Sequence, residues 1–127
     1  MPTQVNPNAA AFADFTELMY RQRRVRDAFA RHVAPDYVQH NPNLPDGPAA
    51  AVAVLEPMFN RPGFEISVHR QMLDGDLGML YLKVRPHPEA PYAAVVDLFR
   101  FAEGKIVEHW DVKQEMPPNP VSRHPLF

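Results

Sequence analysis

The stretch from Tyr92 to Val112 constrains this chain most, because it places ionisable residues inside two apolar, strand-like runs. The runs are joined by a turn that contains Gly104, and they carry Asp97, His109 and Asp111 at positions expected in a core. An isolated buried carboxylate costs several kcal/mol unless it is paired or hydrated. Either a partner compensates that cost or the carboxylates line a cavity.

Length, charge and cysteine content narrow the class of protein. The 127 residues predict one domain over 1–127, long enough to enclose a small pocket and too short for a second core. The formal net charge is -2, and the one basic run, residues 21–31, is interrupted by Asp27, so we expect neither nucleic-acid nor membrane binding. The absence of cysteine excludes disulfides and thiolate chemistry. No signal peptide or membrane span is recognisable, and we expect a cytoplasmic protein.

Hydrophobic periodicity predicts two helices in the first half of the chain. Between Ala9 and His32, apolar residues recur at spacings of three, four and seven, which is typical of an amphipathic helix. The proline-rich residues 35–45 are expected to be extended. Asp46-Gly47-Pro48 then offers a turn with a proline at a first helical position, and a helix over Ala49–Phe59 is expected to follow.

From Phe64 onward the pattern predicts strands. Residues 64–72 alternate between two unlike faces, one of them formed by Phe64, Ile66, Val68, Arg70 and Met72. After a turn at 74–76, we expect strands over Leu77–Val84, Tyr92–Phe101 and Lys105–Lys113. Helices followed by an antiparallel meander predict an α+β fold, in which one face of the sheet is buried on the helices.

The proline-rich tail, from about residue 116 to residue 127, is not expected to form a helix or a central strand. One interpretation lays the tail across a dimer or over a pocket mouth, with Leu126 and Phe127 as an apolar anchor. The other interpretation is a disordered terminus.

Two registers are possible for the last hairpin. A two-residue turn at Glu103-Gly104 would place Asp97 with Trp110, and it would leave His109 and Asp111 on the opposite face. That register would separate the ionisable residues.

A three-residue loop, with Gly104 as the left-handed residue of a bulge, would pair Phe101 with Lys105 and Asp97 with His109. We favour this register because glycine suits the positive φ that it requires. One face then carries Val95, Asp97, Phe99, Val107, His109 and Asp111. The other face carries Leu98, Arg100, Ile106, Glu108 and Trp110.

Two elements carry a family resemblance: the run Tyr37-Val38-Gln39-His40-Asn41-Pro42-Asn43 with Asp46-Gly47, and the runs Val96–Phe101 and Gly104–Asp111. They resemble the SnoaL-like family of polyketide cyclases, in the nuclear transport factor 2-like superfamily, over about residues 10–115. The resemblance implies a cone-shaped α+β barrel, with N-terminal helices packed on a curved antiparallel sheet around an apolar cavity. It also implies homodimers joined through the outer sheet face, and acid-base chemistry without metal or organic cofactor.

The resemblance further implies roles for individual residues. Asp111 matches the acid/base aspartate of the cyclases, and Asp97 stands where some cyclases have a histidine. Two carboxylates in one apolar cavity raise each other's proton affinity, and His109 would share the proton or orient a carboxylate. Oxyanion donors are expected from Tyr37, Gln39 or His40. The expected cavity residues are Phe12, Phe15, Tyr20, Phe59, Val95 and Phe99.

Several of these residues also have a structural interpretation. His40 fixes a turn as readily as it lines a pocket, and Asp97 could be satisfied by backbone donors or by a tyrosine hydroxyl. Trp110 is expected in the core or at a dimer interface, and His69 is expected at the surface. Arg100 and Glu108 are expected to form a cross-strand charge pair.

The sequence therefore predicts a cofactor-independent acid-base enzyme, an aldol-type cyclase or isomerase acting on a small hydrophobic carbonyl compound. The alternative is a noncatalytic homodimer that binds a small molecule. A third interpretation is a metal-dependent enzyme using His40, His109 and a carboxylate. Their spacing matches no dedicated metal motif, so we predict no metal site.

Overall fold

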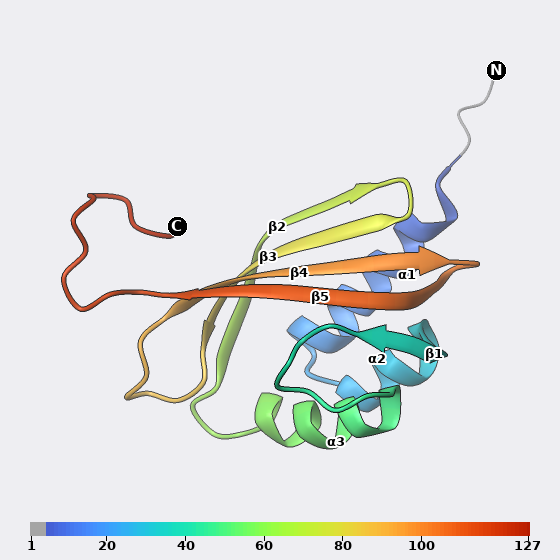
Figure 1. Ribbon diagram of the computed structural model, residues 1–127, viewed down its shortest axis with the longest axis horizontal. Coiled ribbons are helices and arrows are strands. Elements are labelled where there is room, and N and C mark those ends of the chain that lie inside the picture. The colour runs from blue at the N-terminus through green and yellow to red at the C-terminus, as the bar shows by residue number, and fades with distance from the viewer. Residues whose placement is uncertain (1–4) are drawn as a thin grey trace.

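The structure is a computed structural model that describes residues 5–127. Its helical elements are α1 (Pro7–Thr16), the π-helical turn η1 (Glu17–Arg21), α2 (Val25–His32) and α3 (Pro48–Phe59). Its strands are β1 (Val33–Gln39), β2 (Glu65–Asp74), β3 (Leu77–Arg85), β4 (Ala93–Ala102) and β5 (Lys105–Glu115). The strands form one sheet in the order β1-β5-β4-β3-β2, and the helices cover one face of it (Figure 1). This arrangement confirms the expected cone-like α+β class.

The first predicted helix is broken into three pieces. Asn6 caps α1 by accepting a hydrogen bond from the amide of Asn8, and Pro7 occupies the first turn, where its missing N–H is not needed. Arg23 adopts a left-handed conformation with φ 58°, which ends the helical path before α2. The chain therefore turns back, and the Phe15 and Phe29 rings meet with their centroids 6.3 Å apart.

Residues 33–39 were expected only as an extended segment, but they form a fifth strand. β1 pairs in parallel with β5, with Gln39 opposite His109. Its Pro35 is exposed at the edge of the sheet, where a missing N–H does not interrupt a central ladder. The meander expected for β2–β5 is antiparallel, and β1 makes the sheet mixed.

The predicted three-residue loop in the last hairpin is wrong. Ala102 pairs with Lys105, so the connection is a two-residue turn in which both Glu103 (φ 52°) and Gly104 (φ 75°) are left-handed. Phe101 consequently pairs with Ile106 rather than with Lys105. Ile106 is 1% exposed and lies on the inner face, not on the outer face as expected.

A bulge at Val107 then shifts the register by one residue. Phe101 pairs with Ile106 and Arg100 with Glu108, which leaves Val107 as the extra residue on β5. Asp97 therefore lies opposite Asp111 and not opposite His109 as predicted; His109 lies opposite Phe99. The three ionisable residues still share one face, by a different route from the one predicted.

A second bulge lies in β2 at His69, between the pairs Val68–Leu82 and Arg70–Tyr81. It breaks the predicted alternation, because the side chains beyond it move to the opposite face. Met72, expected on the same face as Ile66, is 58% exposed. His69 is exposed, as expected.

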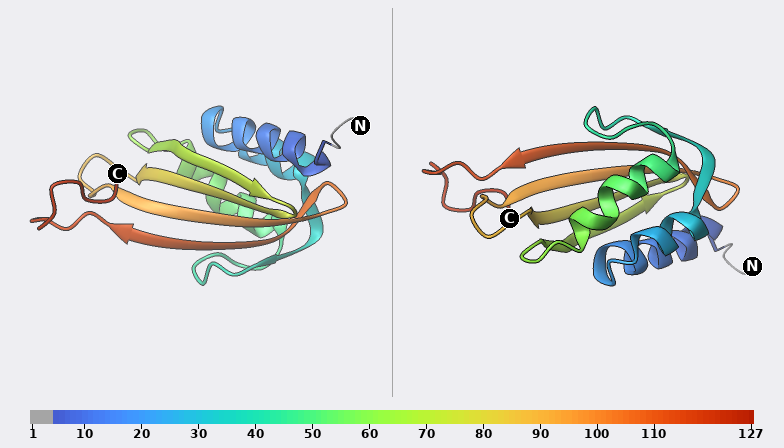
Figure 2. Two further views of the ribbon diagram at one scale, coloured as in Figure 1. Left: turned by 90° about the horizontal axis from the view of Figure 1, so that it is seen from above. Right: turned by 90° about the horizontal axis from the view of Figure 1, so that it is seen from below.

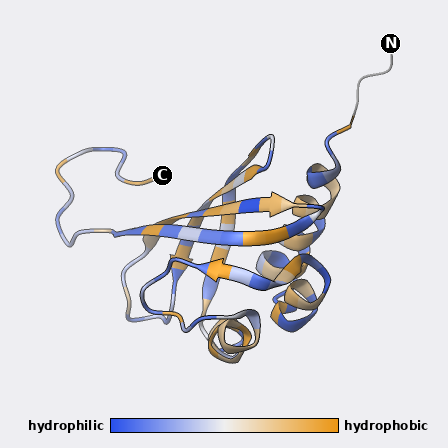
Figure 3. Cartoon of the chain, turned by 45° about the vertical axis from the view of Figure 1, so that its right-hand side comes forward, coloured by the Kyte–Doolittle hydropathy of each residue, from blue (hydrophilic) through white to orange (hydrophobic). Residues whose placement is uncertain are grey.

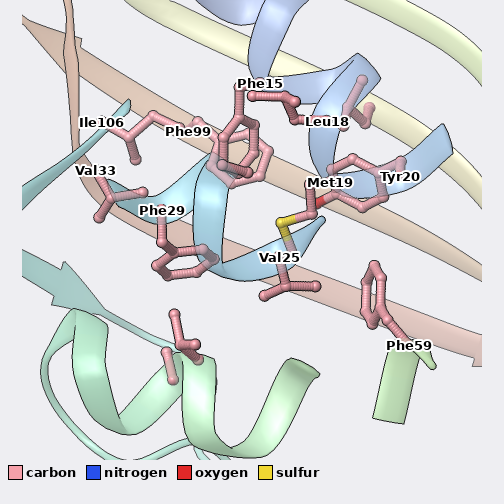
Figure 4. Packing of buried hydrophobic residues seen from close by; sticks show 14 of the residues in the cluster. Phe15, Leu18, Met19, Tyr20, Val25, Phe29, Val33, Phe59, Phe99 and Ile106 are labelled. Carbon is pink, nitrogen blue, oxygen red and sulfur yellow. The ribbon is translucent and has the colours of Figure 1, made fainter. Parts of the chain in front are cut away.

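The helices and the inner sheet face enclose the core. Figure 2 shows α3 crossing the same face that α1 and α2 cover, and Figure 3 shows hydropathy alternating along the strands. In Figure 4, side chains of α1, η1 and α2 gather in one cluster with the sheet residues Phe99 and Ile106. The core residues labelled there are Phe15, Leu18, Met19, Tyr20, Val25, Phe29, Val33, Phe59, Phe99 and Ile106.

Phe12 lies in the closed core and not in the cavity where it was expected. Its ring packs edge-on against Phe99 and Phe101, with centroid distances of 6.0 and 5.6 Å. It reaches this position because Gly78 on β3 has no side chain, and a Cβ there would lie 2.8 Å from the Phe12 ring.

Residues 116–127 form no helix or strand, as expected. The tail returns to the outer face of the sheet, where the Tyr81 hydroxyl donates to the carbonyl of Leu126. The Phe127 ring lies 4.9 Å from the ring of His69. The Leu126 carbonyl and the Phe127 ring therefore attach the tail to β2 and β3, and not over a pocket mouth. Within residues 5–127, no helix has the length and apolar character needed to span a membrane.

Candidate active site

A cavity of about 400 Å³ lies between the helices and the inner sheet face. Most of its wall is apolar; its ionisable lining residues include Asp97, His109 and Asp111, and also Lys113 and Glu115 further along β5. The lining includes the predicted residues Phe15, Tyr20, Tyr37, Gln39, Phe59, Val95, Asp97, Phe99, His109 and Asp111. Among the described residues, the predicted Phe12 and His40 are not part of this lining.

Three of the ionisable residues, Asp97, His109 and Asp111, form a tight cluster where β4 pairs with β5. The Nε2 atom of His109 lies 3.0 Å from Oδ1 of Asp97 and 3.8 Å from Oδ2 of Asp111. The side chains of Asp97 and His109 are 10% and 9% exposed, whereas the Asp111 side chain is 19% exposed. Asp111 is therefore the more accessible of the two carboxylates.

Tyr20 supplies a partner for the more buried carboxylate. Its hydroxyl donates to Oδ2 of Asp97 at 2.5 Å. Burial raises the pKa of Tyr20 well above its ordinary value, and the negative charge of Asp97 raises it further. Tyr20 therefore remains a neutral donor, and its contact with Asp97 matches the tyrosine alternative considered from the sequence.

Asn41 is a site residue that the sequence analysis missed. Its Nδ2 donates a hydrogen bond to Oδ2 of Asp111 at 2.6 Å. This bond engages Oδ2 and not Oδ1 of the carboxylate. Asn41 stands two residues after Gln39, the spacing that puts side chains on the same face of an extended chain. The spacing is visible in the sequence, but it places Asn41 beside Gln39 only once residues 33–39 are known to form a strand.

Gln39 connects the cluster to Tyr37. Its Oε1 accepts hydrogen bonds from Nδ1 of His109 at 2.7 Å and from the backbone amide of Asn41 at 2.9 Å. Its Nε2 donates to the hydroxyl oxygen of Tyr37. Burial raises the pKa of Tyr37 to about 12, so this hydroxyl keeps its proton at neutral pH and can donate it to a group in the cavity.

His40 was predicted as a catalytic or oxyanion-binding residue, and the structure places it outside the cavity. The alternation that turns Gln39 inward turns His40 outward. There its ring stacks on Trp110 at 5.0 Å, and its Nε2 lies 2.7 Å from Oε2 of Glu108. Glu108 also accepts from Nε of Arg100 at 2.9 Å, which confirms the expected cross-strand pair.

The position of His40 also removes the metal site considered from the sequence, which required His40 and His109 to converge. The nearest ligand atoms of Asp97, His109 and Asp111 do lie within 4.8 Å of one another, a spacing that one cation could span. Each carboxylate in this cluster already accepts a hydrogen bond, from Tyr20 or from Asn41. Both carboxylates are therefore hydrogen-bonded within the protein.

Comparisons with known proteins agree with this fold. The model of the SnoaL-like domain matches residues 11–109. No curated protein matches the sequence. A solved NTF2-like protein of unknown function from Mesorhizobium loti has a TM-score of 0.73 and 18% identity, over 90% of this chain and 97% of that chain. A candidate SnoaL-like polyketide cyclase from Jannaschia sp. CCS1 has a TM-score of 0.65 and 17% identity, over 88% and 91%.

A steroid delta-isomerase from Pseudomonas aeruginosa is also similar, with a TM-score of 0.68 and 26% identity over 91% of this chain and 85% of that chain. The family match covers most of the 127 residues. It includes the first of the two elements that carry the resemblance, and the second element as far as His109. The structural neighbours share the arrangement of helices on a curved sheet. This chain belongs to the SnoaL-like family.

Proposed function

We propose that this protein is a cofactor-independent acid-base enzyme, an aldol-type cyclase or isomerase that acts on a small hydrophobic carbonyl compound. One observation carries the proposal: the accessible carboxylate of Asp111 stands beside the buried Asp97–His109 pair in a largely apolar cavity. Paired titratable groups in unlike surroundings are suited to separate acid and base roles. The volume of about 400 Å³ falls in the range of small-molecule sites.

In the proposed reaction, Asp111 removes a proton from the carbon next to a substrate carbonyl, and the electron pair moves onto the carbonyl oxygen. The Tyr37 hydroxyl donates a hydrogen bond to the resulting enolate oxygen. In a cyclisation, the enolate carbon attacks a second carbonyl of the same substrate, and the new alkoxide takes the proton that Asp111 removed, which regenerates the Asp111 carboxylate. In an isomerisation, the proton returns to a different carbon. No electrons are gained or lost overall, so the chemistry requires no redox partner.

The similar proteins support this reaction class. One is named a steroid delta-isomerase and another is a candidate polyketide cyclase. We extend that class to this chain because the groups that proton transfer needs lie together in its cavity. A noncatalytic small-molecule binding protein is the alternative, since the cluster is also internally hydrogen-bonded through Tyr20 and Asn41.

The test is to incubate a panel of hydrophobic ketones and 1,3-dicarbonyl compounds with the wild type and with Asp111→Asn. Binding is measured by calorimetry, and products are identified by mass spectrometry. The proposal predicts turnover by the wild type, and for Asp111→Asn nearly unchanged affinity with turnover reduced about 100-fold or more. Binding without turnover by the wild type across the panel would instead identify a binding protein. Elemental analysis of the same sample tests for stoichiometric metal, which would overturn the cofactor-independent mechanism.

We further propose that the protein forms a homodimer through the outer sheet face, as the family resemblance implies. Met72 and Val112 are 58% and 65% exposed there, and Trp110 lies on the same face of β5 as Val112. Sedimentation equilibrium of the wild type and of Val112→Glu tests this proposal. A monomeric wild type would contradict it, and a dimer that Val112→Glu dissociates would support it.

A further inference from the structure

The hydrogen bonds of Gln39 determine where the proton of His109 resides. A backbone N–H is always a donor, so the Gln39 atom that receives the amide of Asn41 at 2.9 Å must be the carbonyl oxygen. That same oxygen lies 2.7 Å from Nδ1 of His109. An amide oxygen can only accept, so Nδ1 of His109 must carry a hydrogen.

A proton on Nδ1 has a consequence at the other ring nitrogen. Nε2 of His109 lies 3.0 Å from Oδ1 of Asp97, and a hydrogen bond there needs one more proton. Either Asp97 is protonated and donates to a neutral imidazole, or His109 is an imidazolium and donates to a carboxylate. In both cases the Asp97–His109 pair is neutral overall.

We infer that Gln39 is a positioning residue, which holds His109 with hydrogen on Nδ1 and thereby keeps one additional proton in the Asp97–His109 pair. This explains how two carboxylates can face each other across β4 and β5 in an apolar cavity, since only Asp111 then carries an unbalanced charge. It also gives the groups separate roles in the proposed reaction. Asp111 is the base, and the Asp97–His109 pair holds the additional proton.

The same amide group orients Tyr37. The Nε2 atom of Gln39 donates to the Tyr37 hydroxyl oxygen, so the hydroxyl proton of Tyr37 remains for another acceptor. One side chain thus sets both the tautomer of His109 and the donor that faces the cavity. The inference about the tautomer concerns the resting protein, whereas its effect on rate rests on the proposed function.

The tautomer is tested by ¹⁵N NMR of the histidine rings in ¹⁵N-labelled protein at neutral pH, with EDTA present. The His109 signals are assigned from their loss in His109→Asn. We expect Nδ1 of His109 to be protonated in the wild type. In Gln39→Leu, which offers no acceptor, the hydrogen should move to Nε2. In Gln39→Glu, a carboxylate oxygen replaces the acceptor and Nδ1 should stay protonated.

His32 is the internal reference. Its Nε2 lies 2.6 Å from Oδ2 of Asp14, outside the cluster, so its signals should not respond to the substitutions at Gln39. An unprotonated Nδ1 in wild-type His109, or an unchanged tautomer in a folded Gln39→Leu, would overturn the inference. If Gln39→Leu does not fold, the wild type and Gln39→Glu decide the matter.

If the protein has turnover, Gln39→Leu should lower kcat at least tenfold with little change in KM, and Gln39→Glu should restore part of the lost kcat. Absence of any turnover would refute the proposed function and leave the tautomer result standing.

Discussion

Asp97 and Asp111 lie directly opposite each other on β4 and β5, and Nε2 of His109 lies 3.0 Å from the first carboxylate and 3.8 Å from the second. Two carboxylates facing each other in an apolar cavity would repel unless a proton or a cation separates them. The histidine between them, and the hydroxyl and amide donors around them, account for the stability of this arrangement. The same features make it suitable for proton transfer.

Asn41 is predicted to hold Asp111 in position. Asn41→Ala removes the 2.6 Å hydrogen bond to Oδ2 of Asp111, so the carboxylate loses both a fixed orientation and a stabilising donor. We expect kcat to fall about 10-fold to 100-fold with little change in the unfolding midpoint. Steady-state kinetics of Asn41→Ala measure the effect, with the exposed tail variant Asn119→Ala as the control. Equal kcat values for the two variants would contradict this role.

The buried tyrosines predict a loss of stability at alkaline pH. The pKa of Tyr37 is raised from 10.0 to about 12 in the folded protein, so between these values the folded state holds a proton that the unfolded state has released. The contribution of Tyr37 is therefore fully present below pH 10 and is lost as pH rises toward 12, by up to roughly 2 kcal/mol. Urea unfolding at pH 9 and pH 11 should show a smaller loss for Tyr37→Phe than for the wild type. An identical pH dependence for both proteins would contradict the prediction.

Gly78 is predicted to be required for the position of Phe12. An added Cβ would lie 2.8 Å from a ring that is itself 1% exposed, so Gly78→Ala should destabilise the protein by about 1–3 kcal/mol. The double variant Phe12→Leu with Gly78→Ala should be less destabilised than the sum of the two single variants, because the smaller side chain relieves the overlap. Chemical unfolding measures all four proteins. Additive effects would show that the close approach has no energetic consequence.

Much of this fold follows from local pattern. Period-two alternation identified strands β2 to β5, and Asp46-Gly47-Pro48 marked the start of α3. The first helix was predicted as continuous because its apolar spacing runs through the break, and the left-handed backbone of Arg23 leaves no signal in the sequence.

The candidate site depended on a register that the turn residues could not settle. The Glu103-Gly104 turn alone would have separated Asp97 from Asp111, and the bulge at Val107 brings them together. A bulge adds one residue in response to the packing of the whole strand. The predicted three-residue loop therefore places Asp97, His109 and Asp111 on one face, as observed, but with the wrong pairing.

His40 illustrates the same limit on the other side of the sheet. Without the knowledge that residues 33–39 pair with β5, nothing fixed which of Gln39 and His40 faces inward. Histidine was the more familiar catalytic residue. The strand pairing assigns Gln39 to the cluster and His40 to the outer face, where it stacks on Trp110.

The central claim is that Asp111 removes a proton from the carbon next to a carbonyl. Its most direct test uses a hydrophobic ketone that binds the protein, and NMR measures the rate at which the hydrogens next to the ketone carbonyl exchange for deuterium in D₂O. Asp111→Asn is compared with the wild type, and Asp74→Asn, an exposed carboxylate at the end of β2, is the matched control. We predict exchange by the wild type and by Asp74→Asn, and a rate reduced about 100-fold or more in Asp111→Asn. Exchange by Asp111→Asn at the wild-type rate would contradict the assignment of Asp111 as the base.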